Sequence, residues 1–171
     1  MPCRVQDERR STWARYALLV PTDAETLSRG DALDVLAEVW ALNHAIERAS
    51  TRMEARLGVT AQQRLLIRLV GRHGSLTAGA LAALLCVDAS TVSTSVKRLE
   101  KRKMLRRRKD PADGRKTVIE LLPAGKAIDR KEQASVEAAL EAQLESTAAA
   151  RVAIVRQFLG ELCDRVDQVA T

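Results

Sequence analysis

The segment that most constrains the fold of this chain runs from Leu76 to Leu121. Apolar residues recur there at helical spacing in two short runs, Leu81–Leu85 and Val92–Leu99. Asp88 lies between the runs, and we expect its carboxylate to accept backbone N–H groups at the start of the second helix. The pattern therefore predicts two helices joined by a tight turn.

The second predicted helix presents small hydroxyl and basic side chains outward. These residues are Ser90, Thr91, Ser93, Thr94, Lys97 and Arg98. Short hydroxyl side chains let a helix lie close to base edges in the major groove, and cations farther along reach phosphates. Ser and Thr are also ordinary capping residues, so one alone says little, but four together favour a DNA recognition helix.

A predicted strand–turn–strand follows the helices. After Lys103 the pattern changes to period two, and Asp110–Arg115 between the strands contains Pro, Asp and Gly, which are typical turn residues. We interpret this hairpin as the wing of a winged helix-turn-helix. The wing residues expected at DNA are Arg107, Lys109, Asp113, Arg115 and Lys116.

The charge distribution supports binding to nucleic acid. The formal net charge is +6, but Ala89–Lys116 holds eleven basic and three acidic residues. That segment carries +8, so the rest of the chain carries −2. A localised basic stripe on a slightly acidic body is the electrostatic pattern of a DNA-binding protein, whereas the alternative is a solvated charged helix face.

The same segment resembles the winged helix-turn-helix of the MarR family of bacterial regulators. The matching positions are Leu81-Ala82, Ser90-Thr91-Val92, Arg98-Leu99-Glu100-Lys101, Asp113-x-Arg115, Leu121 and Gly125, with Leu57, Thr60 and Gln62 upstream. Lys103 and Leu122 depart from the family pattern, which has Gly and Thr there. The resemblance covers roughly residues 57–128.

The resemblance implies a mostly α (α+β) fold, in which a winged helix-turn-helix lobe lies between N- and C-terminal dimerisation helices. It implies an effector-responsive repressor that binds a pseudo-palindromic operator in double-stranded DNA as a homodimer. Arg115 would enter the minor groove, and Asp113 would hold its guanidinium in place. The alternative is an architectural or non-specific winged-helix module that binds DNA or protein.

The domain organisation follows from helix signals on both sides of this lobe. We expect an N-terminal extension at 1–30 with a short helix near 12–20, a long dimerisation helix at 31–57, the lobe at 58–122 and dimerisation helices at 123–171. The first C-terminal helix should run from Pro123 to about Ser146. The second carries an apolar stripe at spacings of three and four, formed by Val152, Val155, Leu159, Leu162, Val166 and Val169. The alternative for this stripe is packing within one protomer.

Other local signals predict how the lobe is assembled. Thr60 and Gln63 match a capping box that would begin a helix. The apolar residues expected to face the core from that helix are Leu65, Leu66, Leu69 and Val70. Ser75–Thr77 can form one short strand.

An effector pocket is a weaker prediction. Trp40 and His44 lie one helical turn apart, and with Arg64 or Arg68 they could receive the carboxylate of a small anionic or aromatic effector. The alternative is ordinary packing for each of these residues.

Composition limits the other classes of function. Cys3, Cys86 and Cys163 form no paired or metal-binding spacing, and Cys86 is interpreted as a small core residue. No nucleophile elbow, phosphate loop or metal motif is present, so we expect neither an enzyme nor a bound metal or cofactor. No signal peptide or membrane-spanning run is recognised, which predicts a cytoplasmic protein without membrane contact. The operator, the regulated genes, the effector, the sign of regulation and redox sensing by cysteine stay open.

Overall fold

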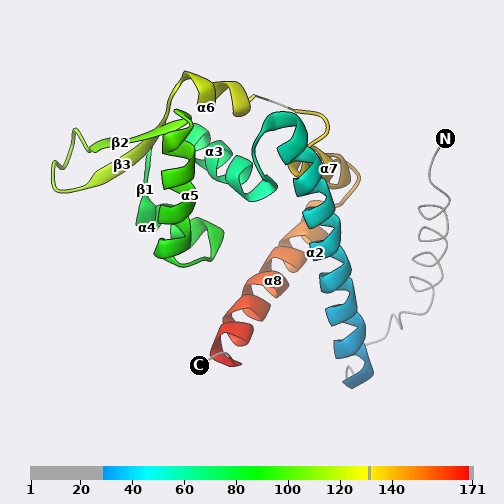
Figure 1. The fold of residues 1–171 in the computed structure, drawn as a ribbon. Coiled ribbons are helices and arrows are strands. Elements are labelled where there is room, and N and C mark those ends of the chain that lie inside the picture. The colour runs from blue at the N-terminus through cyan, green and yellow to red at the C-terminus, as the bar shows by residue number, and fades with distance from the viewer. Residues whose placement is uncertain (1–28, 131, 170–171) are drawn as a thin grey trace. The chain divides into compact units, whose positions relative to one another are not determined.

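The computed structural model describes residues 29–130 and 132–169, so the short helix predicted near 12–20 lies outside the described residues. The chain divides into two compact units, 1–42 and 43–171. The described elements are mainly helices, with a small antiparallel sheet (Figure 1). The predicted fold class is confirmed.

Helices α2 and α3 begin and end largely at the predicted signals. α2 spans Arg29–Leu57 and ends at Gly58, whose φ of 72° suits glycine. α3 spans Ala61–His73 and begins with the predicted capping box. The Thr60 hydroxyl oxygen accepts the Gln63 N–H at 3.2 Å, and the Gln63 side chain accepts the Thr60 N–H at 3.3 Å.

The helix-turn-helix consists of α4, Ala78–Leu85, and α5, Ala89–Lys101, which are bent by 114° relative to each other. Cys86 occupies the turn between them with a φ of 50°. Its N–H donates to the carbonyl of Ala83, and the next N–H donates to the carbonyl of Ala82, which is the Schellman pattern. The Cys86 side chain is exposed, so its interpretation as a core residue is wrong.

Both ends of α5 differ from the expectation. At the start, the Asp88 carbonyl accepts backbone N–H groups, but its carboxylate makes no capping bond, so the predicted carboxylate cap is wrong. At the end, Lys103 adopts a φ of 54°. Its N–H donates to the Glu100 carbonyl at 2.9 Å, and the Met104 N–H donates to the Leu99 carbonyl at 3.0 Å. A lysine therefore occupies the left-handed position that glycine usually takes in this motif.

Three strands form the sheet that carries the wing. β1 is Leu76–Thr77, β2 is Leu105–Lys109 and β3 is Thr117–Leu121, in the order β1-β3-β2 with antiparallel pairing. The register places Arg107 of β2 opposite Ile119 of β3. The predicted short strand before α4 is confirmed, and β2 is an edge strand.

The lobe is built around one apolar core. The buried members include Val59, Leu66, Ile67, Val70, Leu81, Val92, Val96, Leu99, Leu105 and Ile119. Leu65 is 41% exposed, so its predicted core position is wrong, because the buried face of α3 lies one residue away at Leu66, Ile67 and Val70. Among the described residues, no single helix is long and apolar enough to cross a membrane; α4 and α5 pass that test only as a bent pair.

The segment after the wing is broken into α6, Pro123–Ile128, α7, Val136–Glu145, and α8, Ala149–Val169. The single helix predicted from Pro123 to about Ser146 is wrong. Ser135 begins α7 by accepting the Ala138 N–H at 3.1 Å. A serine in the middle of the predicted helix is thus the cap of a new one.

Candidate nucleic-acid interface

The predicted recognition residues all lie on α5, and none of them belongs to the buried face of this helix. Val92, Val96 and Leu99 face inward. Ser93 is half-buried, and the exposed members are Ser90, Thr91, Thr94, Lys97 and Arg98. The Thr94 hydroxyl donates to the Ser90 carbonyl at 3.0 Å, which satisfies its hydrogen while its lone pairs stay open to an outside donor. The helix therefore offers short polar groups followed by cations.

The wing tip, 110–116, is ordered by two aspartates. The Asp110 N–H donates to the Lys116 carbonyl at 3.0 Å, which closes the loop. The Asp113 carboxylate accepts the backbone N–H of Arg115 at 3.1 Å and pairs with the Lys116 ammonium at 3.4 Å. Asp113 thus orients the backbone of Arg115 rather than its guanidinium, which corrects the expected contact, and the Arg115 side chain is exposed.

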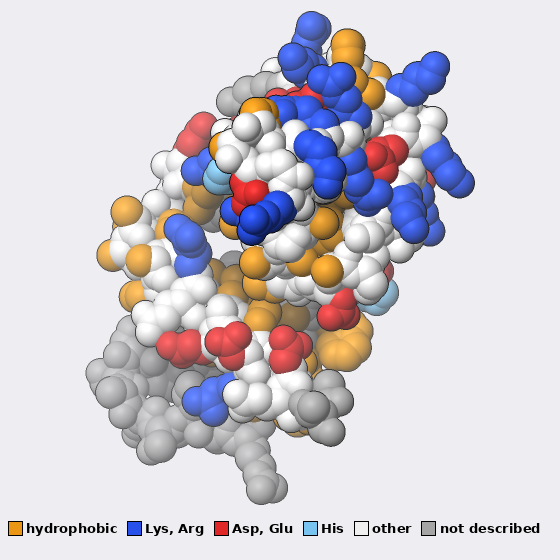
Figure 2. All heavy atoms as spheres, turned by 90° about the vertical axis from the view of Figure 1, so that its left-hand side faces the viewer, with side chains coloured by type: hydrophobic (Ala, Val, Ile, Leu, Met, Phe, Trp, Pro, Cys, Tyr) orange, Lys and Arg blue, Asp and Glu red, His pale blue; other side chains and the backbone are white. Residues whose placement is uncertain are grey.

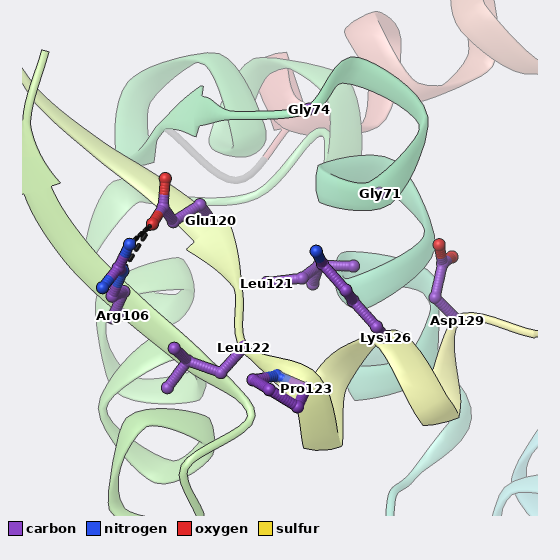
Figure 3. Close-up of a pocket in the computed structure, with 9 residues that line it drawn as sticks. All are labelled: Gly71, Gly74, Arg106, Glu120, Leu121, Leu122, Pro123, Lys126 and Asp129. Atoms are coloured by element: carbon purple, nitrogen blue, oxygen red, sulfur yellow. Dashed lines mark hydrogen bonds and ion pairs between the residues drawn. The ribbon is translucent and has the colours of Figure 1, made fainter. Parts of the chain in front are cut away.

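Two arginines of β2 share one carboxylate. Arg106 and Arg108 both donate to Glu120. Glu120 lies directly opposite Arg106 on β3, and Figure 3 shows the pair that these two residues form. Hydrogen bonds from Arg108 and then Arg106 lower the pKa of Glu120 below its ordinary value. This side of the wing strand is therefore partly neutralised.

Arg107 points to the other side of β2, as alternation along a strand requires. Its guanidinium lies 3.3 Å from a carboxylate oxygen of Glu100 and donates to the carbonyl of Ser93 at 3.5 Å. Its backbone N–H donates to the other Glu100 oxygen at 3.1 Å. The sequence predicts Arg107 as a DNA contact, whereas the structure gives its charge a partner within the lobe.

A set of exposed cations remains without such partners. Within the described part of the chain, no hydrogen-bond or ion-pair partner is found for the side chains of Lys97, Arg98, Lys101, Lys109 and Arg115. Figure 2 looks onto the wing end of the lobe and shows lysine and arginine side chains crowding that face. These cations lie on α5 and the wing, so unpaired positive charge gathers around α5.

The two arginines predicted for an effector pocket bind the segment that follows α6. Arg64 is 2% exposed, and its guanidinium donates to the carbonyls of Ile128 and Arg130 and lies 3.3 Å from Glu137. Arg68 donates to the backbone and side chain of Asp129. These partners lie more than 60 residues away in the sequence, so no local signal reveals them.

The other two residues predicted for the pocket, Trp40 and His44, lie on α2. His44 pairs with Glu47 at 3.1 Å on the surface of α2. Trp40 belongs to the other compact unit and is 60% exposed. The effector pocket therefore stays a prediction, and the guanidinium groups of Arg64 and Arg68 already have partners in residues 128–137.

One open hollow of about 740 Å³ lies between the end of α3, the wing and α6 (Figure 3). Its lining residues are Gly71, Gly74, Arg106, Glu120, Leu121, Leu122, Pro123, Lys126 and Asp129. The carboxylates of Glu120 and Asp129 are already bound by arginines. No group of three or more His, Cys, Asp or Glu side chains suited to a metal is found among the described residues.

A comparison with protein-family models decides the classification of this lobe. The model described as MarR family matches residues 57–116, which span α3, the helix-turn-helix and the wing up to its tip. Residues 57–116 are therefore similar to the MarR family. No curated protein matches the chain.

Solved structures of MarR-type regulators share the fold. A mutant MarR from E. coli complexed with operator DNA is 20% identical, with a TM-score of 0.60 over 80% of this chain and 99% of that one. The transcriptional regulator SlyA is 20% identical, with a TM-score of 0.63 over 79% and 95%. The regulator BldR from Sulfolobus solfataricus is 16% identical, with a TM-score of 0.63 over 82% and 99%. The MarR fold thus extends beyond the matched segment to most of the described chain.

Proposed function

We propose that this chain is a sequence-specific DNA-binding transcriptional regulator, an effector-responsive repressor that acts as a homodimer on a pseudo-palindromic operator. The observation that carries the proposal is the combination on α5 of exposed hydroxyl side chains with exposed cations, beside a wing tip that carries Arg115. Hydroxyl groups can read base edges, whereas cations bind the phosphate backbone of any sequence.

The wing completes the proposed interface. Arg115 lies at the tip of a loop whose backbone is held by Asp113, so its side chain starts from an ordered position. An arginine at such a tip suits a narrow minor groove, where the negative potential is strongest. A mutant MarR from E. coli that shares this fold has been solved in complex with operator DNA, which supports DNA binding as the role proposed for this lobe.

Exposed apolar side chains support the homodimer. Val155, Leu159 and Val166 of α8 are 49%, 43% and 57% exposed, and they repeat at spacings of four and seven on one side of the helix. Such a stripe is stable when a partner helix covers it. Two recognition helices would then contact half-sites about one helical turn apart.

The test begins with selection of a site from random-sequence duplexes by the wild-type chain. Affinity for the selected duplex and for a scrambled duplex is then measured at several salt concentrations. We expect a large preference for the selected site, which Arg115→Ala reduces, while Arg72→Ala, a control at an exposed position in the last turn of α3, leaves it unchanged. Equal affinity for both duplexes would establish the architectural alternative.

Effector response is tested on the same complex. Benzoate, a minimal aromatic anion, is titrated into the complex with the selected duplex. Release of DNA at constant ionic strength supports an effector of this class. An unchanged complex argues against aromatic anions as effectors.

A further inference from the structure

The edge of the wing strand is joined to the recognition helix by one carboxylate. β2 pairs only with β3 among the described strands, so the outer edge of β2 lacks a strand partner there. The Glu100 carboxylate from α5 fills one position on that edge by accepting the Arg107 N–H at 3.1 Å. The backbone N–H of Arg107, which would otherwise donate to water, is thereby bound to a side chain of α5.

The side chain of Arg107 adds a second link between the same two elements. Its guanidinium pairs with Glu100 at 3.3 Å and reaches the Ser93 carbonyl at 3.5 Å. Ser93 and Glu100 are two helical turns apart on α5, so Arg107 spans much of the helix length. Both side chains of the ion pair are largely shielded from solvent, at 31% and 27% exposure. We name this arrangement the Glu100–Arg107 bracket.

The residue types fit a positioning role. Glu100 lies in the last turn of α5, where the helix dipole disfavours a carboxylate unless a cation is close. The planar fork of arginine can bind a carboxylate and a carbonyl at once, which the single ammonium of lysine cannot do in the same geometry. The bracket therefore requires both residues.

The bracket connects the two elements that are proposed to read different grooves. α5 would lie in the major groove, and the wing tip would reach the minor groove, so their relative position must match the duplex. Because the charge of Arg107 is already paired, it differs from Lys109, an exposed cation of the same strand.

We propose that Arg107 and Glu100 determine sequence selectivity by fixing the wing relative to the recognition helix, and that Arg107 does not bind phosphate. This inference rests on the proposed DNA-binding function. It predicts that breaking the bracket weakens binding to the selected duplex more than binding to a scrambled one. It also predicts no change in the number of counterions released, since Arg107 neutralises no phosphate.

The experiment measures the affinity of full-length variants for both duplexes across a range of salt concentrations. For Arg107→Ala we expect the preference for the selected duplex to fall on the order of tenfold, with an unchanged slope of log affinity against log salt. For Lys109→Ala, the matched control, we expect similar weakening on both duplexes. Its slope should be smaller by about 0.9 for each phosphate that is no longer neutralised.

Two further variants separate positioning from loss of folding. Arg107→Lys keeps the charge and should still lose selectivity, because the fork is absent. Glu100→Gln should lose selectivity as Arg107→Ala does, and the double variant should lose no more than either single variant, since both break one bracket. Thermal unfolding of each variant, compared with wild type, tests whether the lobe stays folded.

The outcomes distinguish failure of the bracket proposal from failure of the proposed function. If Arg107→Ala matches Lys109→Ala in slope and in uniform weakening, or if the effects of Glu100→Gln and Arg107→Ala add, the bracket proposal is overturned while a selective wild type still supports the proposed function. A wild type with no preference between the duplexes overturns both proposals.

Discussion

Gly125 of α6 packs closely against the backbone of Met104, which lies between α5 and β2. This contact allows the effect of a substitution on the free energy of unfolding to be predicted from distances. Gly125 lies in α6 and is buried, and a Cβ atom at this position would lie 2.1 Å from the carbonyl oxygen of Met104. The same oxygen accepts the Leu122 N–H at 2.9 Å. An ordinary carbon–oxygen contact is about 3.3 Å, so Gly125→Ala requires a backbone shift of roughly 1 Å that strains this buried hydrogen bond.

The expected change in stability combines three terms. Overpacking costs about 1–3 kcal/mol, and strain or loss of the hydrogen bond adds about 1 kcal/mol, while the helix preference of Ala over Gly offsets about 0.5–1 kcal/mol. We therefore expect Gly125→Ala to lower the free energy of unfolding by about 1–3 kcal/mol, which corresponds to about 2–12 °C in Tm for a chain of this size.

The assay is thermal and urea unfolding at one fixed protein concentration, because association with a partner would shift both midpoints. Gly79→Ala is the matched control. Gly79 also lies in a helix, but a Cβ atom there would meet no neighbouring side chain or strand within 4 Å, so the substitution should raise stability by up to about 1 kcal/mol. The reasoning is refuted if Gly125→Ala is as stable as wild type or if both substitutions shift the midpoint in the same direction.

Three further predictions follow from single contacts. Lys103→Gly should stabilise the chain by about 1 kcal/mol in urea unfolding, because the φ of 54° costs lysine more than glycine; a lower midpoint would contradict this. Arg64→Ala should lower the free energy of unfolding by about 3–5 kcal/mol in the same assay, because it leaves the buried Glu137 carboxylate oxygens without a cation. Arg68 is more exposed, so Arg68→Ala should cost about 1 kcal/mol or less. Equal costs for the two substitutions would refute the reasoning. Because the pKa of Glu120 is lowered in the folded state, its pairing stabilises the chain above the ordinary Glu pKa of about 4.3 and is lost as pH falls through the folded value. The Tm difference between wild type and Glu120→Gln should thus shrink on acidification below about pH 4, and a constant difference would count against this assignment.

The accuracy of the sequence predictions depends on the range of the interactions behind them. The capping box at Thr60, the end of α2 at Gly58 and the two helices with their turn depend on residues within a few positions of each other. Such local hydrogen-bonding signals can be read from one sequence. The break after Ile128 is not evident in the sequence, because the helix pattern of residues 123–146 is overridden by contacts with α3.

For the candidate interface, local pattern predicts the second helix of the helix-turn-helix and the turn of the wing, and the structure places the predicted residues on those elements. The pattern does not reveal which cations are already paired. Arg107 and Lys109 look alike in the sequence, yet one is held by Glu100 and the other is exposed. Whether such a cation finds a partner depends on how a helix packs beside a hairpin, so a charge count from the sequence overstates the unpaired positive charge on this face.

The sequence by itself determined the winged helix-turn-helix, the position of its second helix and the concentration of basic residues around that helix, because helix periodicity, capping and turn chemistry act over a few residues. Only the tertiary structure decided that Arg64 is buried, that Cys86 is exposed in a left-handed turn, and that Glu100 and Glu120 bind three arginines of the wing strand. The physical reason is that burial and charge pairing depend on which distant segments pack together, and a single sequence does not display those neighbours.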